Sequence, residues 1–300
     1  MLELKVDEFL ASLLSIVQPL APIDLPLLDA HGAVLASDLH FGERLLLKEG
    51  SPIRSNVIGL AASLGLGHLK TRPQPRVVVL SAGPDLVEPG QRIRGSEEYE
   101  INSWQLTTLV REIGGVGFRV HSIPDDELEL RSVIEDQLVR ADLIVVAGEQ
   151  HDDSFELISG ALSSLGTITK VQLEINRSGK YNFGQIGPDK TPVITLPGDA
   201  ISAYISMQLF VRPVIRTMLG SKEIFCPSIK VQLERDFNQT IEIKSYLLAQ
   251  TSEDNRSAMV LPDQNDFATL AIANSLVAVN KSEKLKAGDY VTSVILPRIK

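Results

Sequence analysis

Cysteine is almost absent from this sequence, because Cys226 is the only one among 300 residues. A lone thiol excludes an internal disulfide and any zinc cluster built from several cysteines, and it fits a reducing compartment. Aromatic residues are also scarce at 5%, whereas 44% of the residues are hydrophobic. These proportions indicate a core packed mainly by Val, Ile and Leu side chains.

Basic residues are outnumbered, with 29 Lys and Arg against 38 Asp and Glu and a net charge of −9. An acidic chain gains little from counterion release at phosphates, so nucleic acid is not an expected partner. The first residues interrupt their leucines with Glu3, Asp7 and Glu8, unlike a signal peptide or a membrane span. The sequence therefore predicts a cytoplasmic protein without membrane insertion.

Three regions of the chain differ in pattern, and 300 residues are enough for more than one domain. Residues 1–49 join a helical pattern at 6–17 to a proline-rich stretch, which predicts an N-terminal helical and extended segment. Residues 50–225 alternate strand and helix patterns. Residues 226–300 alternate apolar and polar side chains, which predicts a small, mostly β domain with one short helix near 266–273.

The middle region predicts an α/β domain. Four short runs rich in β-branched residues are expected strands: 76–83, 117–123, 142–148 and 191–198. Most of them lack polar alternation, which is typical of strands covered on both faces. Strand and helix alternation predicts right-handed βαβ units on a mainly parallel sheet, whose ligands bind beyond the carboxyl ends of the strands. The helix after Asp199 meets Pro213, where we expect a kink or a break.

Polar residues gather in the loops at this edge of the predicted sheet. Asp85 follows a strand-ending glycine, Asn102 and Ser103 lie at a helix start, and Arg177 and Lys180 flank a turn. Helix starts attract anions, and paired basic residues can clamp a phosphate. Each loop alone also has an ordinary structural interpretation as a cap or a turn. Their arrival in one order at one edge favours a ligand site.

The stretch "AGEQHDDSFE" at residues 147–156 offers four acids and a histidine after an expected strand. A hard cation needs several oxygens that converge on one point. Adjacent acids such as Asp152 and Asp153 rarely converge, and His151 has no second histidine near it in the sequence. We therefore predict no metal site in this loop.

The order of these motifs resembles the molybdopterin molybdenumtransferases, namely the MoeA proteins and the gephyrin E domain. The resemblance covers essentially the whole chain, from "PLLDAHGAVLASDL" at 26–39 and "GSPIRSNVIGLAASLG" at 50–65 to "LPGDAISA" at 196–203. It implies an α/β sandwich of the molybdopterin-binding, MogA-like type. It also implies a homodimer, in which the apolar stripe of the first helix would be covered: Phe9, Leu10, Leu13 and Val17.

The resemblance also implies the site residues. In an active enzyme the catalytic acids would be Asp85, Glu100 and Glu156. The cofactor-binding positions would be Asn102, Ser103, Gly148, Arg177, Gly179, Lys180, Pro197, Gly198, Asp199 and Ser202. Family members use Mg²⁺ with molybdopterin and molybdate, so an active protein would need the same.

Several chemical positions depart from the family pattern. Glu100 stands where the family has Asp, Ser154 replaces the loop Asp, and Glu149 replaces the second glycine of a pair. A new carboxylate there repels a phosphorylated ligand. The family also carries an inserted domain with an MDGYA motif, where this chain has only residues 40–49. That domain supplies one wall of the active cleft in the family.

Two functions from different classes follow from the resemblance. One is insertion of molybdate into adenylylated molybdopterin with Mg²⁺. The other is a catalytically impaired scaffold without a cofactor, as in gephyrin, which binds a partner peptide such as the tail of a cell-division protein. The altered cofactor loops favour the scaffold. A plain molybdopterin-binding protein of the MogA type would need a "GGVS" loop, which is absent.

The scaffold hypothesis predicts a groove between the α/β domain and the β domain. An exposed edge of the C-terminal sheet could accept an added strand from an extended partner. The residues expected to line the groove are Pro227, Ile229, Val231, Leu261 and Pro262.

Overall fold

A computed structural model describes residues 1–82, 86–95, 97–123, 126–148, 152–176, 178–239, 241–282 and 284–297. At positions 121–123, 152–153 and 178 it describes the backbone without the side chains.

The central sheet has seven strands in the order β1-β12-β13-β14-β11-β7-β10. Their bounds are β1 (Leu2–Leu4), β12 (Gly166–Ile175), β13 (Ser178–Ile186), β14 (Thr191–Leu196), β11 (Leu143–Gly148), β7 (Arg76–Ala82) and β10 (Val116–Ile123). Neighbouring strands run parallel, except that β13 is antiparallel to both β12 and β14. The predicted mainly parallel α/β sheet is therefore confirmed.

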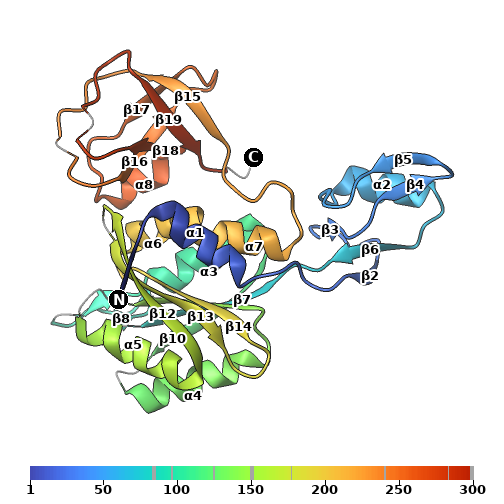
Figure 1. The fold of residues 1–300 in the computed structure, drawn as a ribbon, viewed down its shortest axis with the longest axis horizontal. Helices are drawn as coiled ribbons and strands as arrows, with labels where there is room; N and C mark the ends of the chain where they lie inside the picture. The colour runs from blue at the N-terminus through green and yellow to red at the C-terminus, as the bar shows by residue number, and fades with distance from the viewer. Residues whose placement is uncertain are drawn as a thin grey trace.

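Helices cover both faces of this sheet (Figure 1). One face carries α1 (Val6–Ser15), α3 (Asn102–Ile113), α6 (Ala200–Ser206) and α7 (Arg212–Met218), and the other carries α4 (Glu127–Leu138) and α5 (Asp152–Leu165). Strand β7 shows why its sequence lacks polar alternation. Val77 and Val79 enter the core under α1 and α3, while Val78 and Leu80 enter the core under α4 and α5. Both faces of the strand are therefore buried.

The helix that contains Pro213 changes geometry before the proline. A π-helical turn, Met207–Val211, separates α6 from α7, and Pro213 is the second residue of α7. Proline cannot donate a backbone hydrogen bond to the carbonyl four residues earlier, and its ring crowds that carbonyl. The carbonyl belongs to Leu209, within the π turn. The irregularity expected at Pro213 therefore appears as a change of helix type one turn earlier.

The apolar stripe of α1 is covered within the chain. Phe9 and Leu13 are fully buried and Val17 is 7% exposed, all three in the core that α1 shares with the sheet. Leu10, the fourth residue of the stripe, is half-buried. The argument that the stripe would lie in water without a second subunit is therefore wrong for Phe9, Leu13 and Val17. The predicted homodimer needs another physical basis.

Residues 23–72 form an arm that extends away from the sheet (Figure 1). Its strands are β2 (Ile23–Pro26), β6 (His68–Arg72), β3 (Val34–Leu35), β4 (Leu39–Phe41) and β5 (Arg44–Leu47), and its helix is α2 (Ser55–Ser63). A small core built around Leu35, Ile53 and Leu69 holds these elements together. The arm thus crosses the boundary expected at 49–50, while α1 and β1 belong to the central α/β domain.

The C-terminal region is a closed barrel. Its strands follow the order β15 (Ser228–Leu233), β17 (Ser257–Val260), β16 (Ser245–Thr251), β18 (Ser275–Val279) and β19 (Tyr290–Ile295), and α8 (Phe267–Ile272) packs beside β16. The mostly β character and the short helix were both predicted. The prediction of an exposed sheet edge was wrong. Each strand of a closed barrel already pairs on both sides and cannot accept a further strand.

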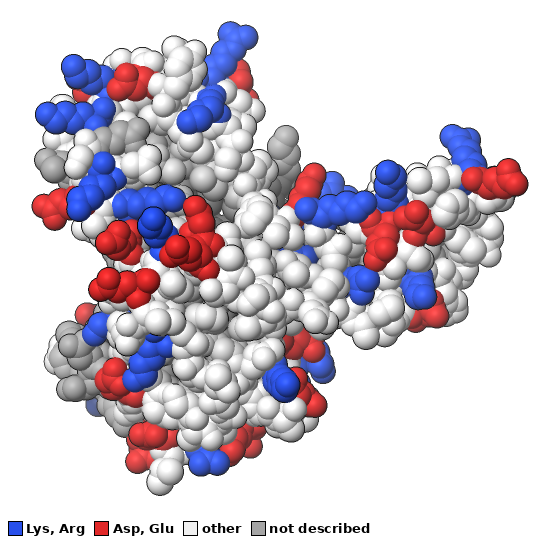
Figure 2. Space-filling model, viewed as in Figure 1, with Lys and Arg blue, Asp and Glu red and all other residues white. Residues whose placement is uncertain are grey.

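The barrel joins the α/β domain through a mixed apolar cluster. Ile201 and Ile205 of α6 pack there with Leu248 and Leu276 of the barrel. Cys226 belongs to the same cluster as a free thiol, and burial raises its pKa above the ordinary value. Figure 2 shows acidic and basic side chains interspersed over one face of the molecule. Within the described part of the chain, no helix is long and apolar enough to cross a membrane.

Candidate functional site

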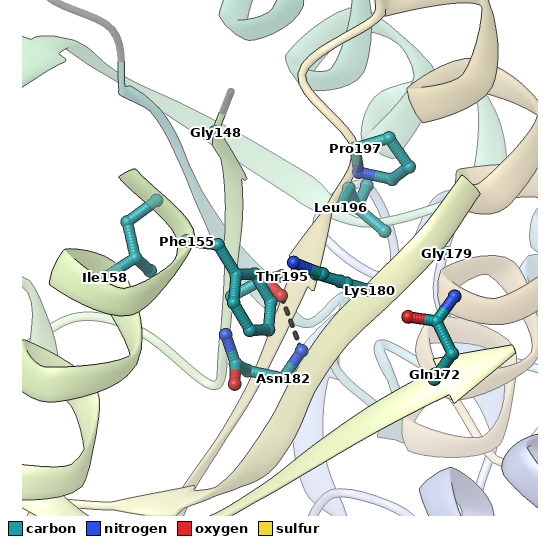
Figure 3. A pocket seen from close by; sticks show the side chains of 10 residues that line it. All are labelled: Gly148, Phe155, Ile158, Gln172, Gly179, Lys180, Asn182, Thr195, Leu196 and Pro197. Carbon is teal, nitrogen blue, oxygen red and sulfur yellow. Dashed lines mark hydrogen bonds between the residues drawn. The ribbon is translucent and has the colours of Figure 1, made fainter. Parts of the chain in front are cut away.

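A cavity of about 150 Å³ lies at the carboxyl ends of β11 and β14, beneath α5 (Figure 3). Its lining residues are Gly148, Phe155, Ile158, Gln172, Gly179, Lys180, Asn182, Thr195, Leu196 and Pro197. Four of the positions taken from the family resemblance are among them: Gly148, Gly179, Lys180 and Pro197. The cavity therefore lies where a parallel sheet places its ligands.

Strand β13 supplies the basic group of the cavity. Successive side chains of a strand point to opposite faces. Lys180 and Asn182 therefore line the cavity on the α5 side, whereas Tyr181 and Phe183 enter the core on the α1 side. The Lys180 ammonium lies 5.7 Å from the centre of the Phe155 ring. Lys180, expected beside a turn, is thus the third residue of β13, and this strand holds its side chain against α5.

Two glycines leave no room for a side chain beside the cavity. A Cβ at Gly148 would overlap the Cδ1 of Ile158, and a Cβ at Gly179 would overlap the side-chain amide of Gln172. Both overlapping atoms are ends of flexible side chains, so a side chain at either position would require Ile158 or Gln172 to move.

Asn182 and its neighbours form a buried polar group that the sequence did not single out. The backbone N–H of Asn182 donates to Thr195 Oγ1 at 2.6 Å, and Ser159 Oγ donates to Asn182 Oδ1 at 3.1 Å. Asn182 is fully buried and Thr195 is 4% exposed. The one available signal was the spacing of two residues between Lys180 and Asn182, which places both on the same face of a strand.

The start of α3 is tied to the turn after β14. Asn102 Nδ2 donates to the Gly198 carbonyl at 2.7 Å. Asp199 caps α6 by accepting from the Ser202 backbone N–H at 3.1 Å and from the Ser202 hydroxyl. Gly198, Asp199 and Ser202 were expected at an anion site. In the structure Gly198 accepts the hydrogen bond from Asn102, and Asp199 and Ser202 cap α6. Pro197 is the residue of the motif that lines the cavity.

Glu100 is a buried cap of α3. It is 1% exposed, and its carboxylate accepts from the Ser103 backbone N–H at 2.7 Å and from the Ser103 hydroxyl. Arg119 Nη2 lies 3.8 Å from the same carboxylate, and Arg119 Nε donates to Ser103 Oγ at 2.6 Å. The Arg119 guanidinium also stacks over Trp104 at 4.2 Å and pairs with Glu88. Glu100 and Ser103 are therefore engaged with each other and with Arg119.

Glu156 lies on α5, away from Glu100. Its side chain is 60% exposed and pairs with Lys170 of β12. It projects from α5, whereas Glu100 precedes α3 on the opposite face of the sheet. The two predicted catalytic acids are thus not brought together. Asp85, Glu149, His151 and Arg177 were also singled out, and they lie outside the described residues.

The described carboxylates do not fit a Mg²⁺ ion. A magnesium site needs oxygens that converge with near-octahedral geometry. Both oxygens of Glu100 already accept hydrogen bonds, and Glu156 faces solvent beside a lysine. Across the described ranges, no group of three or more His, Cys, Asp or Glu side chains is placed to hold a metal.

Two of the five residues predicted to line the peptide groove are buried, so their assignment is wrong. Val231 is fully buried inside the barrel, and Leu261 is 3% exposed in the cluster beneath it. Ile229 packs against the barrel core, while Pro227 is exposed. Pro262 alone of the five lines a hollow of about 550 Å³ near Asn176. The sequence alternation that suggested the groove instead closes the barrel, which turns one side of each strand inward.

Comparison with known proteins gives the following relatives. Molybdopterin molybdenumtransferase 1 of Mycobacterium tuberculosis is 28% identical over 260 residues, which cover 83% of this chain and 61% of that protein. Molybdopterin molybdenumtransferase 2 of the same species is 30% identical over 188 residues, with 61% and 46% covered. The chain thus spans less than two thirds of these relatives. No family model matches it.

Solved structures give the same answer for the fold. The molybdopterin biosynthesis MoeA protein from Pyrococcus horikoshii superposes with a TM-score of 0.85 at 16% identity, covering 99% of this chain and all of that chain. A molybdenum cofactor biosynthesis protein from Pyrococcus furiosus gives a TM-score of 0.74 at 19% identity, with 97% and 100% covered. At these identities the likeness shows the fold alone, which agrees with the fold that the sequence resemblance implied.

Proposed function

We propose that this chain is a shortened, divergent relative of the molybdopterin molybdenumtransferases. On this premise, we propose that it binds a phosphorylated pterin of the molybdopterin type. The ligand would enter the cavity beside Lys180. One observation carries the proposal: four separate positions of the family motifs, Gly148, Gly179, Lys180 and Pro197, line a single cavity. We further propose that the protein acts in molybdenum cofactor biosynthesis with a reduced ability to insert molybdate.

The chemistry of the cavity supports an anionic ligand. Lysine carries three donors and no acceptor, and it holds phosphate as a point charge. The volume of the cavity limits the size of the ligand group that can enter, because about 150 Å³ accepts one ring or one tetrahedral group. A whole phosphorylated pterin is larger, so we infer that only one end of the ligand enters.

The engaged carboxylates support reduced catalysis. Glu100 caps α3 and pairs with Arg119, and Glu156 pairs with Lys170 on the other face of the sheet. Neither is placed to hold Mg²⁺ beside the cavity, so no step through the ion is derived. Molybdate is a substrate in this family and would be captured poorly without convergent groups.

Binding is tested by a matched pair of lysine variants. Lys180→Ala should weaken molybdopterin binding about ten- to hundredfold, because a hydrogen bond between charged groups contributes about 1.5–3 kcal/mol. Lys170→Ala removes the same charge from the neighbouring strand β12, where the side chain is 34% exposed and pairs with Glu156. It should change the Kd less than twofold. Isothermal titration calorimetry with freshly prepared molybdopterin measures both.

Equal effects of the two substitutions would place the ligand outside the cavity. A molybdate insertion assay on the same preparations, with Mg²⁺ and adenylylated molybdopterin, should give turnover at background level. Robust insertion that Asp85→Ala abolishes would overturn the proposal of reduced catalysis.

We also propose that two copies associate through the arm. The arm exposes large apolar side chains, with Leu28 at 85%, Phe41 at 65% and Leu45 at 40% exposure. Exposed apolar surface of this kind is typical of interaction sites. Light scattering at micromolar concentration should give twice the chain mass of 32.8 kDa, and Phe41→Ser with Leu45→Ser should reduce it to one chain. A monomer at all concentrations would contradict the proposal.

The partner peptide predicted from the sequence stays a prediction. Two of the five residues assigned to its binding, Val231 and Leu261, are buried, so they cannot contact a peptide on the surface.

A further inference from the structure

Asn182 is one of the residues that line the cavity, and it is fully buried. It follows Lys180 by two residues on β13, so both side chains face α5. In Figure 3 the nitrogen end of the Asn182 amide points toward the ring of Phe155, and the oxygen end points away from it. The amide nitrogen and the Lys180 ammonium therefore approach the cavity from the same strand.

The hydrogen bonds of Asn182 are incomplete. Its backbone N–H donates to Thr195. Its Oδ1 lies 3.1 Å from Ser159 Oγ, whose hydroxyl is shared with the Phe155 carbonyl at 2.7 Å. Its Nδ2 is buried and has no hydrogen-bond partner within the described part of the chain. A buried N–H group without a partner costs free energy, and folded proteins keep few of them. An unpartnered donor on the wall of a cavity therefore indicates a group that enters the cavity and accepts from it.

The other polar groups of the cavity match this donor. Lys180 donates only. Thr195 Oγ1 already accepts from the Asn182 backbone N–H, so its own hydroxyl hydrogen is available to a ligand. Three donors on β13 and β14 thus face a space of about 150 Å³. Donors that converge in this way favour an oxygen with negative charge, because charge-assisted hydrogen bonds are the strongest ones.

We infer that Asn182 is a ligand-contact residue that donates from Nδ2 to a negatively charged oxygen, and that the phosphate end of the ligand enters the cavity. This inference rests on the proposed function, and it adds a residue and an orientation to it. A tetrahedral phosphate fits the volume, and its oxygens can accept from Lys180, Asn182 and Thr195 together. The pterin end then lies toward the cavity mouth.

Substitutions at Asn182 test the polarity of the contact. Asn182→Ala should weaken molybdopterin binding about ten- to hundredfold in calorimetry. Asn182→Asp has nearly the same shape and should weaken it further, because a carboxylate repels the phosphate. Ser159→Ala is the matched control, since it removes the partner of Oδ1 and leaves Nδ2 in place. It should change the Kd less than threefold. If Asn182→Asp binds as tightly as the unaltered protein, the amide faces the ligand with its oxygen and the inference is wrong.

A direct measurement uses the unaltered chain and does not depend on the folding of any variant. In protein labelled with ¹⁵N-asparagine, the side-chain amide signal of Asn182 is identified by its contacts with Phe155. We expect molybdopterin and inorganic phosphate to shift this signal. A shift with molybdate but none with phosphate would overturn the orientation. No shift with molybdopterin, while Lys180→Ala still weakens binding, would reject the role of Asn182 and leave the proposed function intact.

Discussion

Replacement of Arg119 by methionine is expected to lower the free energy of unfolding by about 3 kcal/mol, because it leaves a buried carboxylate without its cation. The Glu100 side chain is 2% exposed and the Arg119 side chain 18% exposed. Urea denaturation followed by circular dichroism measures the loss. Glu100→Gln added to Arg119→Met should restore part of the stability, since a neutral amide still accepts from the Ser103 backbone N–H.

The control is an ion pair of similar composition on the surface. Arg131 and Glu135 of α4 lie 3.2 Å apart, with side chains 42% and 46% exposed. Exposed pairs contribute about 0–1 kcal/mol, so Arg131→Met should change stability little. If Arg119→Met costs no more than Arg131→Met, the Glu100 carboxylate is not held by Arg119. Its assignment as a structural cap, rather than a metal ligand, then fails.

Replacement of Phe9 by alanine is expected to cost about 3–5 kcal/mol of unfolding free energy, the usual range for removing a buried phenyl group. The ring of Phe9 is fully buried. Its centroid lies 5.1 Å from that of Tyr181, 5.6 Å from that of Phe183 and 5.0 Å from that of Phe210. Two of these contacts are edge-to-face, an arrangement that adds to the burial of area. Alanine would leave a cavity among three rings.

Leu128→Ala is the matched control for this loss, because Leu128 of α4 is 74% exposed and lies outside the arm. Surface substitutions usually change stability by less than about 0.5 kcal/mol. Urea titration of both variants should therefore separate them clearly. Similar small losses would mean that α1 is detached from the sheet in solution, and the covered stripe of α1 would then become available to a second subunit after all.

The parallel part of the fold could be predicted because its strands carry an unambiguous pattern. The run at 76–82 is apolar on both faces, and the structure buries it on both faces. The β12–β13 hairpin could not be read in the same way. Its first strand mixes Thr, Lys, Gln and Glu with apolar residues and is only partly buried along much of its length. Barrel closure also escaped prediction, because it depends on two residue pairs between β15 and β17, which adjacent sequence cannot show.

The candidate site shows the same division. Motif positions such as Gly148 and Lys180 could be located in the sequence, and the structure brings them to one cavity. The contacts of the predicted acids could not be predicted, because Arg119, the cation beside Glu100, lies nineteen positions later on β10. Asn182 stands between two aromatic residues, and nothing in that context indicates that its amide is buried at a cavity.

The alternation of β13 fixes the register in which this strand can pair. Tyr181 and Phe183 face α1, and Lys180 and Asn182 face α5. A slip of β13 by one residue against its neighbouring strands would exchange the two sets. A lysine and an asparagine would then enter the aromatic core, and two rings would fill the cavity. Core and cavity thus depend on one register of β13. A slip of one residue damages stability and binding together, whereas a slip of two residues keeps each side chain on its own face.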